Sequence, residues 1–287
     1  MKPVVFRHEA MATHFEIAVA GGGDSYARQA AAAAFRELDR LEGELSRFIE
    51  SSDIGRANRV PEAGSLAIGD DAMECLLLAA AVAEATRGAF DPAFRSGGRR
   101  EPAAGTPAFT IDPASHSLTS HVPRLELDLG AVGKGYALDR MAGVLAEWEV
   151  DSACLNSGGS TVLCLAPPHS AAGWVVGIGD GDARRELTLA RSALSGSGLA
   201  VKGHHLVDPR TGGRAARTLR AWASAPQAAL ADALSTAFFV MEDAEVAAFC
   251  ADHAGIGAAL SAPGGRLLCH GTLDPSRLLK NYAGRRD

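Results

Sequence analysis

Apolar residues recur every three or four positions in several stretches of the chain, which is the pattern of helices with one buried face. The first stretch predicts a helix that follows Gly21–Gly23 and is capped by Asp24 or Ser25. Its buried face is made by Phe35, Leu38, Leu41 and Leu45. The same pattern predicts further helices over residues 70–88, 134–148, 229–241 and 243–253.

Short segments of alternating or β-branched apolar residues predict strands between these helices. They are HFEIAVA (14–20), LELDL (125–129) and the runs ACLN, STVLCL, WVVGI and ELTLA. AFTID and HSLTS predict one hairpin, and Pro263-Gly264-Gly265 predicts another. Because strict alternation of strands with helices is absent, we expect an α+β fold with largely antiparallel sheets and packed helices. We expect residues 1–287 to form a single domain, with room for two closely packed subdomains.

The composition of the chain argues against several classes of protein. Hydrophobic residues make up 47% and charged residues 22% of the chain, as in ordinary soluble globular proteins. The net charge is −6 without a Lys/Arg cluster, so we expect no nucleic-acid partner. The longest apolar run, Cys75 to Ala83, is far shorter than the roughly 20 residues of a membrane span. MKPVVFRHEAM lacks the apolar segment of a secretory signal, and we predict a cytoplasmic protein with reduced cysteines.

Four polar clusters interrupt this sequence, and two of them precede the middle of the chain. In GAFDPAF (88–94) the proline disfavours a helical conformation for Asp91, so the carboxylate is either presented to a ligand or part of a helix-exit turn. In LDLGAVGKGYALD (127–139) a strand leads from Asp128 into a glycine-rich turn, and a helix begins near Lys134. Such a turn suits a phosphate, although a close-packed corner explains it equally well.

The other two clusters are LNSGGS (155–160) and LSGSGLAVKGHHLVDPRTGG (194–213). Gly158-Gly159 in the first fits a plain hairpin turn as well as a binding site. The second contains His205 directly before Leu206-Val207. A histidine in that position is either a core residue or a base that titrates near neutral pH.

Asp232 is the most unusual residue, because it stands within the apolar stretch ALADALSTAFFVM (229–241). Thr236 lies one helical turn further on the same side. No Lys or Arg lies within a turn of Asp232 along the chain, and an unpaired buried carboxylate is strongly destabilising. Asp232 either caps a helix that starts there, with Thr236 bonding back to a carbonyl, or both side chains face a hard cation.

Taken together and in this order, the clusters resemble the FAD:protein FMN transferase (ApbE) family. The matching stretches are MATHFEIAV, LSRFIESSDIGRAN, GAFDPAF, DLGAVGKGYALD, LNSGGS, SG before HHLVDPRTG, and ADALSTA. Two departures stand out. Ala12 occupies a position where the family usually has Gly, and the segment after Ser195-Gly196 is short and lacks the usual aromatic residue.

The resemblance implies a flavin site between the sheet and helix units. Contacts to FAD are implied for Met11, Phe48, Ala89, Phe90, Asp91, Asp128, Lys134 and Val207. Mg²⁺ is implied as the metal, held by the backbone carbonyl of Ala131 and the side chains of Asp232 and Thr236. His205 matches the functional histidine of the family, so His205 and Asp232 are the expected catalytic residues.

The implied activity is the Mg-dependent transfer of the FMN moiety of FAD to a Thr or Ser hydroxyl of an acceptor flavoprotein, with release of AMP. Two alternatives differ in the fate of FAD. A Mg-dependent FAD pyrophosphatase would use water in place of the hydroxyl, and a non-catalytic FAD-binding protein would leave FAD intact.

Overall fold

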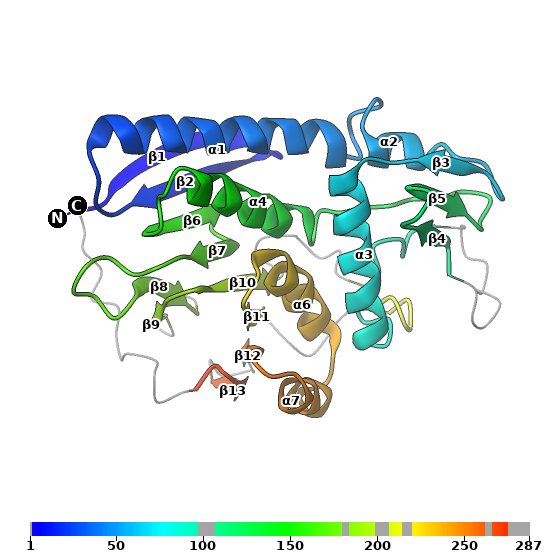
Figure 1. The fold of residues 1–287 in the computed structure, drawn as a ribbon. Helices are drawn as coiled ribbons and strands as arrows, with labels where there is room; N and C mark the ends of the chain where they lie inside the picture. The colour runs from blue at the N-terminus through cyan, green and yellow to red at the C-terminus, as the bar shows by residue number, and fades with distance from the viewer. Residues whose placement is uncertain are drawn as a thin grey trace.

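The structure is a computed structural model that describes residues 2–96, 107–179, 184–198, 207–213, 220–261 and 266–274. A fully antiparallel sheet of eight strands forms its centre, in the order β1-β2-β6-β7-β10-β11-β12-β13 (Figure 1). The strands are β1 (Val4–Ala10), β2 (Thr13–Val19), β6 (Ala153–Ser157), β7 (Thr161–Cys164), β10 (Ser192–Gly198), β11 (Arg220–Ala225), β12 (Gly257–Ser261) and β13 (Leu267–Gly271).

Helices cover one face of this sheet. In Figure 1, α1 lies along β1 and β2, and α4 and α6 follow it across the sheet towards β10 and β11. The helices are α1 (Asp24–Leu45), α2 (Asp53–Ala57), α3 (Asp70–Ala85), α4 (Gly133–Glu147), α6 (Ala228–Val240) and α7 (Asp243–Asp252). Alternate residues of β2, such as Phe15 and Ile17, are fully buried beneath the helices, as the period of a strand requires. No helix in the described ranges is long and apolar enough to cross a membrane.

Two smaller sheets complete the fold. The strands β3 (Ser65–Ala67), β5 (Ser117–Ser120) and β4 (Phe109–Asp112) pair in that order beyond α2 and α3. The hairpin of β8 (Trp174–Ile178) and β9 (Arg185–Leu189) packs on the central sheet through a second apolar cluster, which includes Trp174, Leu189 and Trp222. The predicted α+β class with antiparallel sheets is therefore confirmed.

The segment LELDL differs from its prediction. Leu125 and Leu127 are buried as the alternation requires, yet the segment pairs with no strand in the part of the chain that the structure describes. The side chain of Asn58 supplies the pairing instead: the Leu127 N–H donates to its Oδ1 at 2.6 Å, and its Nδ2 donates to the Leu127 carbonyl at 3.0 Å. The Asp128 N–H donates to the carbonyl of Pro92 at 2.9 Å. One amide side chain thus satisfies backbone groups that a neighbouring strand would otherwise pair.

Two predicted helix ends also differ. Gly23 is the N-cap of α1, and Asp24 is its first helical residue rather than its cap. Helix α3 ends at Ala85, three residues before the expected Gly88. The Gly88 N–H closes that end by donating to the carbonyl of Ala83 at 2.8 Å. The strands β1, β3, β10 and β11 and helix α2 are additions that the apolar pattern did not predict.

The turn between β1 and β2 is strained. Ala10 pairs with Thr13, so Met11 and Ala12 form a two-residue loop, and their φ angles are +50° and +56°. Two positive φ angles are typical of a type I′ turn, in which glycine is strongly favoured at the second position. A left-handed conformation costs a residue with a Cβ roughly 1–2 kcal/mol.

We predict that Ala12→Gly stabilises the protein by about 0.5–1 kcal/mol, because the relief of strain outweighs the larger entropy of glycine in the unfolded chain. Urea unfolding of both proteins measures the difference. Ala18→Gly, within β2, is the matched control and should lower the free energy of unfolding. A destabilised Ala12→Gly protein would contradict the turn geometry.

Candidate active site

A cavity of about 290 Å³ opens between the segment after α3, the segment before α4 and helix α6. Seven of the predicted site residues line it, namely Ala89, Phe90, Asp91, Asp128, Ala131, Val207 and Thr236. These residues come from four separate parts of the chain. The structure therefore brings together most of the positions that the family resemblance implied.

Asp232 lies in the second turn of α6 and does not cap the helix, which starts at Ala228. The side chain that bonds back to a carbonyl is Ser235, whose hydroxyl donates to the Asp232 carbonyl at 2.9 Å. The position of Asp232 inside α6 excludes a capping role, and the partner of the Thr236 hydroxyl among the described residues is Ser197 rather than a carbonyl. The Asp232 residue is only 3% exposed, so its carboxylate depends on partners from other elements.

The partners of the Asp232 carboxylate come from the sheet and from α4. The Ser195 hydroxyl donates to Oδ1 at 3.2 Å, and the Thr161 hydroxyl lies 3.4 Å from the same oxygen. The Gly135 N–H donates to Oδ2 at 3.2 Å. Lys134 Nζ lies 3.6 Å from Oδ2. A cation far away in sequence thus partly balances the buried charge.

The start of α4 also organises the rim of the cavity. Lys134 Nζ donates to the Gly130 carbonyl at 2.6 Å, and Asp128 Oδ1 accepts the Gly130 N–H at 2.9 Å. Arg47 Nε lies 3.3 Å from Asp128 Oδ2, and its guanidinium stands 4.3 Å from the ring centre of Phe48. Phe48 is 79% exposed, so its ring is presented to solvent, and Arg47 links it to the cavity-lining Asp128.

Gly135 and Asp139 explain why α4 and α6 can approach so closely. A Cβ on Gly135 would lie 2.3 Å from the Ala228 carbonyl oxygen, so any larger residue forces the helices apart. The Asp139 carboxylate accepts the N–H groups of Ala228 at 2.8 Å and Ala229 at 2.9 Å. Asp139 therefore satisfies the first turn of α6 from the neighbouring helix, because Gln227 makes no side-chain cap.

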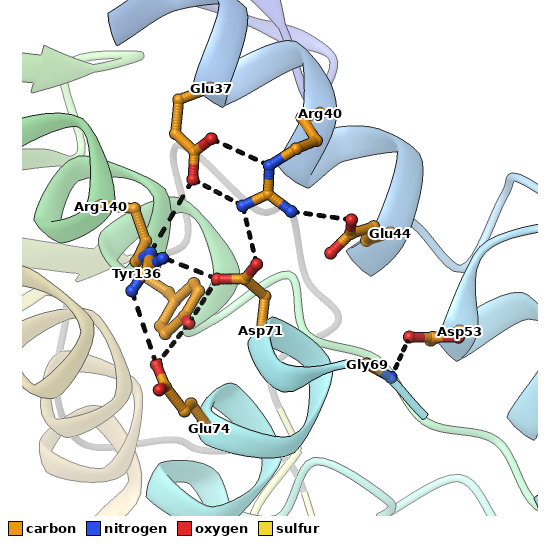
Figure 2. A network of polar contacts seen from close by, with 9 residues as sticks. All are labelled: Glu37, Arg40, Glu44, Asp53, Gly69, Asp71, Glu74, Tyr136 and Arg140. Carbon is orange, nitrogen blue, oxygen red and sulfur yellow. Dashed lines mark hydrogen bonds and ion pairs between the residues drawn. The ribbon is translucent and has the colours of Figure 1, made fainter. Parts of the chain in front are cut away.

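A network of charged residues ties α4 to α1 and α3 (Figure 2). Its members are Glu37, Arg40, Glu44, Asp71, Glu74, Tyr136 and Arg140. The Tyr136 hydroxyl lies 2.8 Å from carboxylate oxygens of both Asp71 and Glu74, and Arg40 donates to Asp71 at 2.7 Å. Burial raises the pKa of Asp71, but the hydrogen bonds from Arg40 and Tyr136 outweigh it and hold that pKa below its usual value. The network holds the N-terminal end of α3, the helix that precedes Ala89–Asp91, against α1 and α4.

The lining of the cavity does not include Met11, Phe48, Lys134 or Asp232. Asp91 Oδ1 accepts the Ala93 N–H at 2.8 Å. Asp91 is exposed by area, yet the protein around the cavity restricts its hydration, and this desolvation raises the pKa of its carboxyl. Met11 is absent from the cavity lining, and its N–H donates to Glu42 Oε1 at 2.9 Å. His205 lies outside the residues that the structure describes.

Several residues at the site were missed by the sequence reasoning. Phe94, Arg95 and Glu126 line the cavity, and Thr161 and Ser195 contact the buried carboxylate. Arg95 directly follows GAFDPAF, so the extent of that block was a usable signal. Thr161 and Ser195 gave no such signal in the sequence, because small polar residues are common in turns and strands.

The donor groups near Asp232 suit a hard cation. The described residues hold no group of three or more His, Cys, Asp or Glu side chains that could bind a metal ion. Ala131 and Thr236 both line the cavity, and Thr236 lies one turn after Asp232 on α6. One carboxylate, one hydroxyl and one backbone carbonyl form an all-oxygen set, which Mg²⁺ prefers to nitrogen or sulfur. The residues present therefore fit the implied metal.

A family model described as the ApbE family matches residues 11–260. The chain therefore belongs to the ApbE family, as the sequence blocks indicated.

Named relatives agree with this assignment. The FAD:protein FMN transferase of Klebsiella pneumoniae (strain 342) is 28% identical, over 36% of this chain and 34% of that protein. The FAD:protein FMN transferase of Treponema pallidum (strain Nichols) is 29% identical, over 58% of this chain and 52% of that protein. The matched parts thus span from a third to about half of those relatives. The crystal structure of the ApbE protein of Thermotoga maritima MSB8 shares 26% identity at a TM-score of 0.80, covering 94% of this chain and 98% of that one.

The environment of Asp139 leads to a prediction about pH. Burial raises the pKa of its carboxyl to about 6, although the two N–H bonds lower it. The folded protein therefore keeps the Asp139 proton to a higher pH than the unfolded chain, whose pKa is near 4. The stabilisation is complete below about pH 4 and is lost as pH rises to about 6.

We expect the free energy of unfolding of the wild type, relative to Asp139→Asn, to fall by on the order of 1–3 kcal/mol between pH 4 and pH 7. Urea unfolding at closely spaced pH values measures this difference. A difference that grows with pH would show that the hydrogen bonds from α6 outweigh desolvation.

Proposed function

We propose that this chain transfers the FMN moiety of FAD to a Thr or Ser hydroxyl of an acceptor protein and releases AMP. The observation that carries the proposal is the cavity in which seven of the implied flavin and metal positions converge, with Thr236 in its lining one helical turn after the buried Asp232. The relatives named FAD:protein FMN transferase support the same reaction.

The flavin nucleotide is proposed to occupy this cavity. Ala89, Phe90 and Asp91 form one wall, and Asp128 and Val207 contribute to the others. Lys134 at the start of α4 supplies a positive charge for the pyrophosphate. Met11 and Phe48 lie outside the cavity lining, and we propose that they border the part of FAD that extends beyond it.

The Asp232 carboxylate, the Thr236 hydroxyl and the Ala131 carbonyl are proposed to hold Mg²⁺. When bound, Mg²⁺ supplies positive charge that stabilises the pyrophosphate and the leaving phosphate. Thr161, Ser195 and the Gly135 N–H keep the Asp232 carboxylate in place, because each donates to it or lies within hydrogen-bonding distance.

The transfer requires one bond to form and one to break. The acceptor hydroxyl oxygen bonds to the FMN-side phosphorus, and the bond from this phosphorus to the bridging oxygen breaks, so that AMP leaves with that oxygen. The hydroxyl proton passes to a base, which we propose is His205. Reactions of this type depend chiefly on positioning and charge stabilisation, which a cavity built from rigid elements provides.

We predict that Asp232→Ala and the isosteric Asp232→Asn lower Mg-dependent FMN transfer by about 100-fold or more, while FAD affinity changes only a few-fold. In-gel flavin fluorescence of an acceptor measures transfer, and fluorescence titration measures FAD binding. Asp39→Asn, on the exposed face of α1, is the control and should remain active. Full activity of Asp232→Asn would remove the metal assignment.

For His205→Ala we predict a loss of turnover of roughly 10²–10⁴-fold that exceeds any loss of FAD affinity. Single-turnover transfer at saturating FAD, compared with the FAD dissociation constant, separates the two effects. A defect confined to affinity would make His205 a binding residue rather than a base.

The choice of acceptor group is tested by incubating the protein with FAD and Mg²⁺, with and without a candidate acceptor peptide. The proposal expects an FMN adduct on a Thr or Ser of the peptide by mass spectrometry, together with AMP. Free FMN formed without the peptide would indicate a pyrophosphatase, and intact FAD after hours would indicate a binding protein.

A further inference from the structure

Five hydroxyl side chains lie in contact with one another between the central sheet and α6, and three of them, Thr236, Ser197 and Ser235, form a hydrogen-bonded chain. They are Thr161 on β7, Ser195 and Ser197 on β10, and Ser235 and Thr236 on α6. The first four are at most 3% exposed, whereas Thr236 lines the cavity. Ser195 and Ser197 both face α6, because alternate residues of a strand share one face of the sheet.

The direction of these hydrogen bonds follows from counting protons. A serine hydroxyl has one proton, and a backbone carbonyl can only accept. The Ser235 hydroxyl donates to the Asp232 carbonyl at 2.9 Å, so its proton is used. In the contact between Ser197 and Ser235, at 2.9 Å, Ser197 must therefore be the donor.

The same count then determines the orientation of Thr236. Because the Ser197 proton is directed to Ser235, the 3.2 Å contact between Ser197 and Thr236 requires Thr236 to donate. The Thr236 proton thus points towards β10 and away from the cavity that this side chain lines. Its oxygen lone pairs are left for the cavity side, which is the orientation that a metal-binding hydroxyl needs.

We propose that Ser197 and Ser235 are positioning residues that orient the Thr236 hydroxyl as an acceptor towards the divalent cation. This inference rests on the proposed metal site and adds two residues that touch neither the cation nor FAD. Without Ser197 or Ser235, the rotation of the Thr236 hydroxyl is no longer determined, and its proton can turn into the cavity. Outer partners of this kind typically change metal affinity by about 10–100-fold.

Mn²⁺ binding to the full chain tests the proposal without relying on catalysis. Electron paramagnetic resonance counts the free Mn²⁺ as the ion is titrated into the protein without nucleotide, because added ADP would itself bind the ion. We expect Ser197→Ala to weaken Mn²⁺ binding about tenfold and Ser197→Thr, which keeps the hydroxyl, to restore most of it. ADP binding without metal should stay within about twofold of the wild type in both variants.

Two controls separate positioning from a general packing effect. Ser157→Ala removes a hydroxyl that is fully buried and has no hydrogen-bond partner among the described residues, and it should leave Mn²⁺ binding unchanged. In a Thr236→Ala background, Ser197→Ala should have no further effect, because Ser197 acts through Thr236. If Ser197→Ala does not fold, Ser235→Ala interrupts the same chain at its next link and is expected to give the same loss.

The outcomes distinguish this inference from the proposed function. If Thr236→Ala weakens Mn²⁺ binding but neither Ser197→Ala nor Ser235→Ala does, the positioning role is wrong and the metal site stands. If Thr236→Ala binds Mn²⁺ as the wild type does, the metal site itself is wrong, and the positioning role is lost with it.

Discussion

The buried carboxylate of Asp232 is the constraint on which the site depends. Such a group is stable only where donors or opposite charges surround it. Here the donors come from two elements: Ser195 lies on the sheet, and the Gly135 N–H and Lys134, whose Nζ is 3.6 Å away, both belong to the start of α4. Because one carboxylate joins three elements, any shift of α6 against the sheet or α4 exposes or unpairs its charge. The need to keep this charge paired therefore fixes α6, which contributes Thr236 to the cavity, relative to α4 and the sheet.

The helix packing around this carboxylate follows from two residues of one sequence block. Gly135 lets α4 touch the backbone of α6, and Asp139 binds the N–H groups that begin α6. The ion-pair network through Asp71 and Tyr136 then joins α4 to α3. The glycine-rich turn is thus a close-packed corner, and the same corner presents Asp128 and Ala131 to the cavity. The two interpretations that the sequence left open are compatible.

Periodic apolar faces could be predicted from the sequence, because they depend only on local spacing. Helices α1, α4, α6 and α7 were found this way to within a few residues. LELDL shows the limit of the method: its burial alternates as predicted, but Asn58, far away in sequence, takes the place of a strand. The cationic partner of Asp232 could not be predicted from neighbouring residues either, since Lys134 lies about 100 residues earlier in the sequence. The site residues lining the cavity were indicated by family blocks, and their FAD and metal roles stay predictions.

We propose that Asp232, Thr236 and the Ala131 carbonyl together hold a divalent cation against a flavin nucleotide. Crystals soaked with Mn²⁺ and FAD test it most directly, because manganese can be located by its anomalous scattering. We expect one strong peak in contact with all three oxygen atoms and with the phosphates. A map without a peak there, with Lys134 still beside the Asp232 carboxylate, would contradict this proposal.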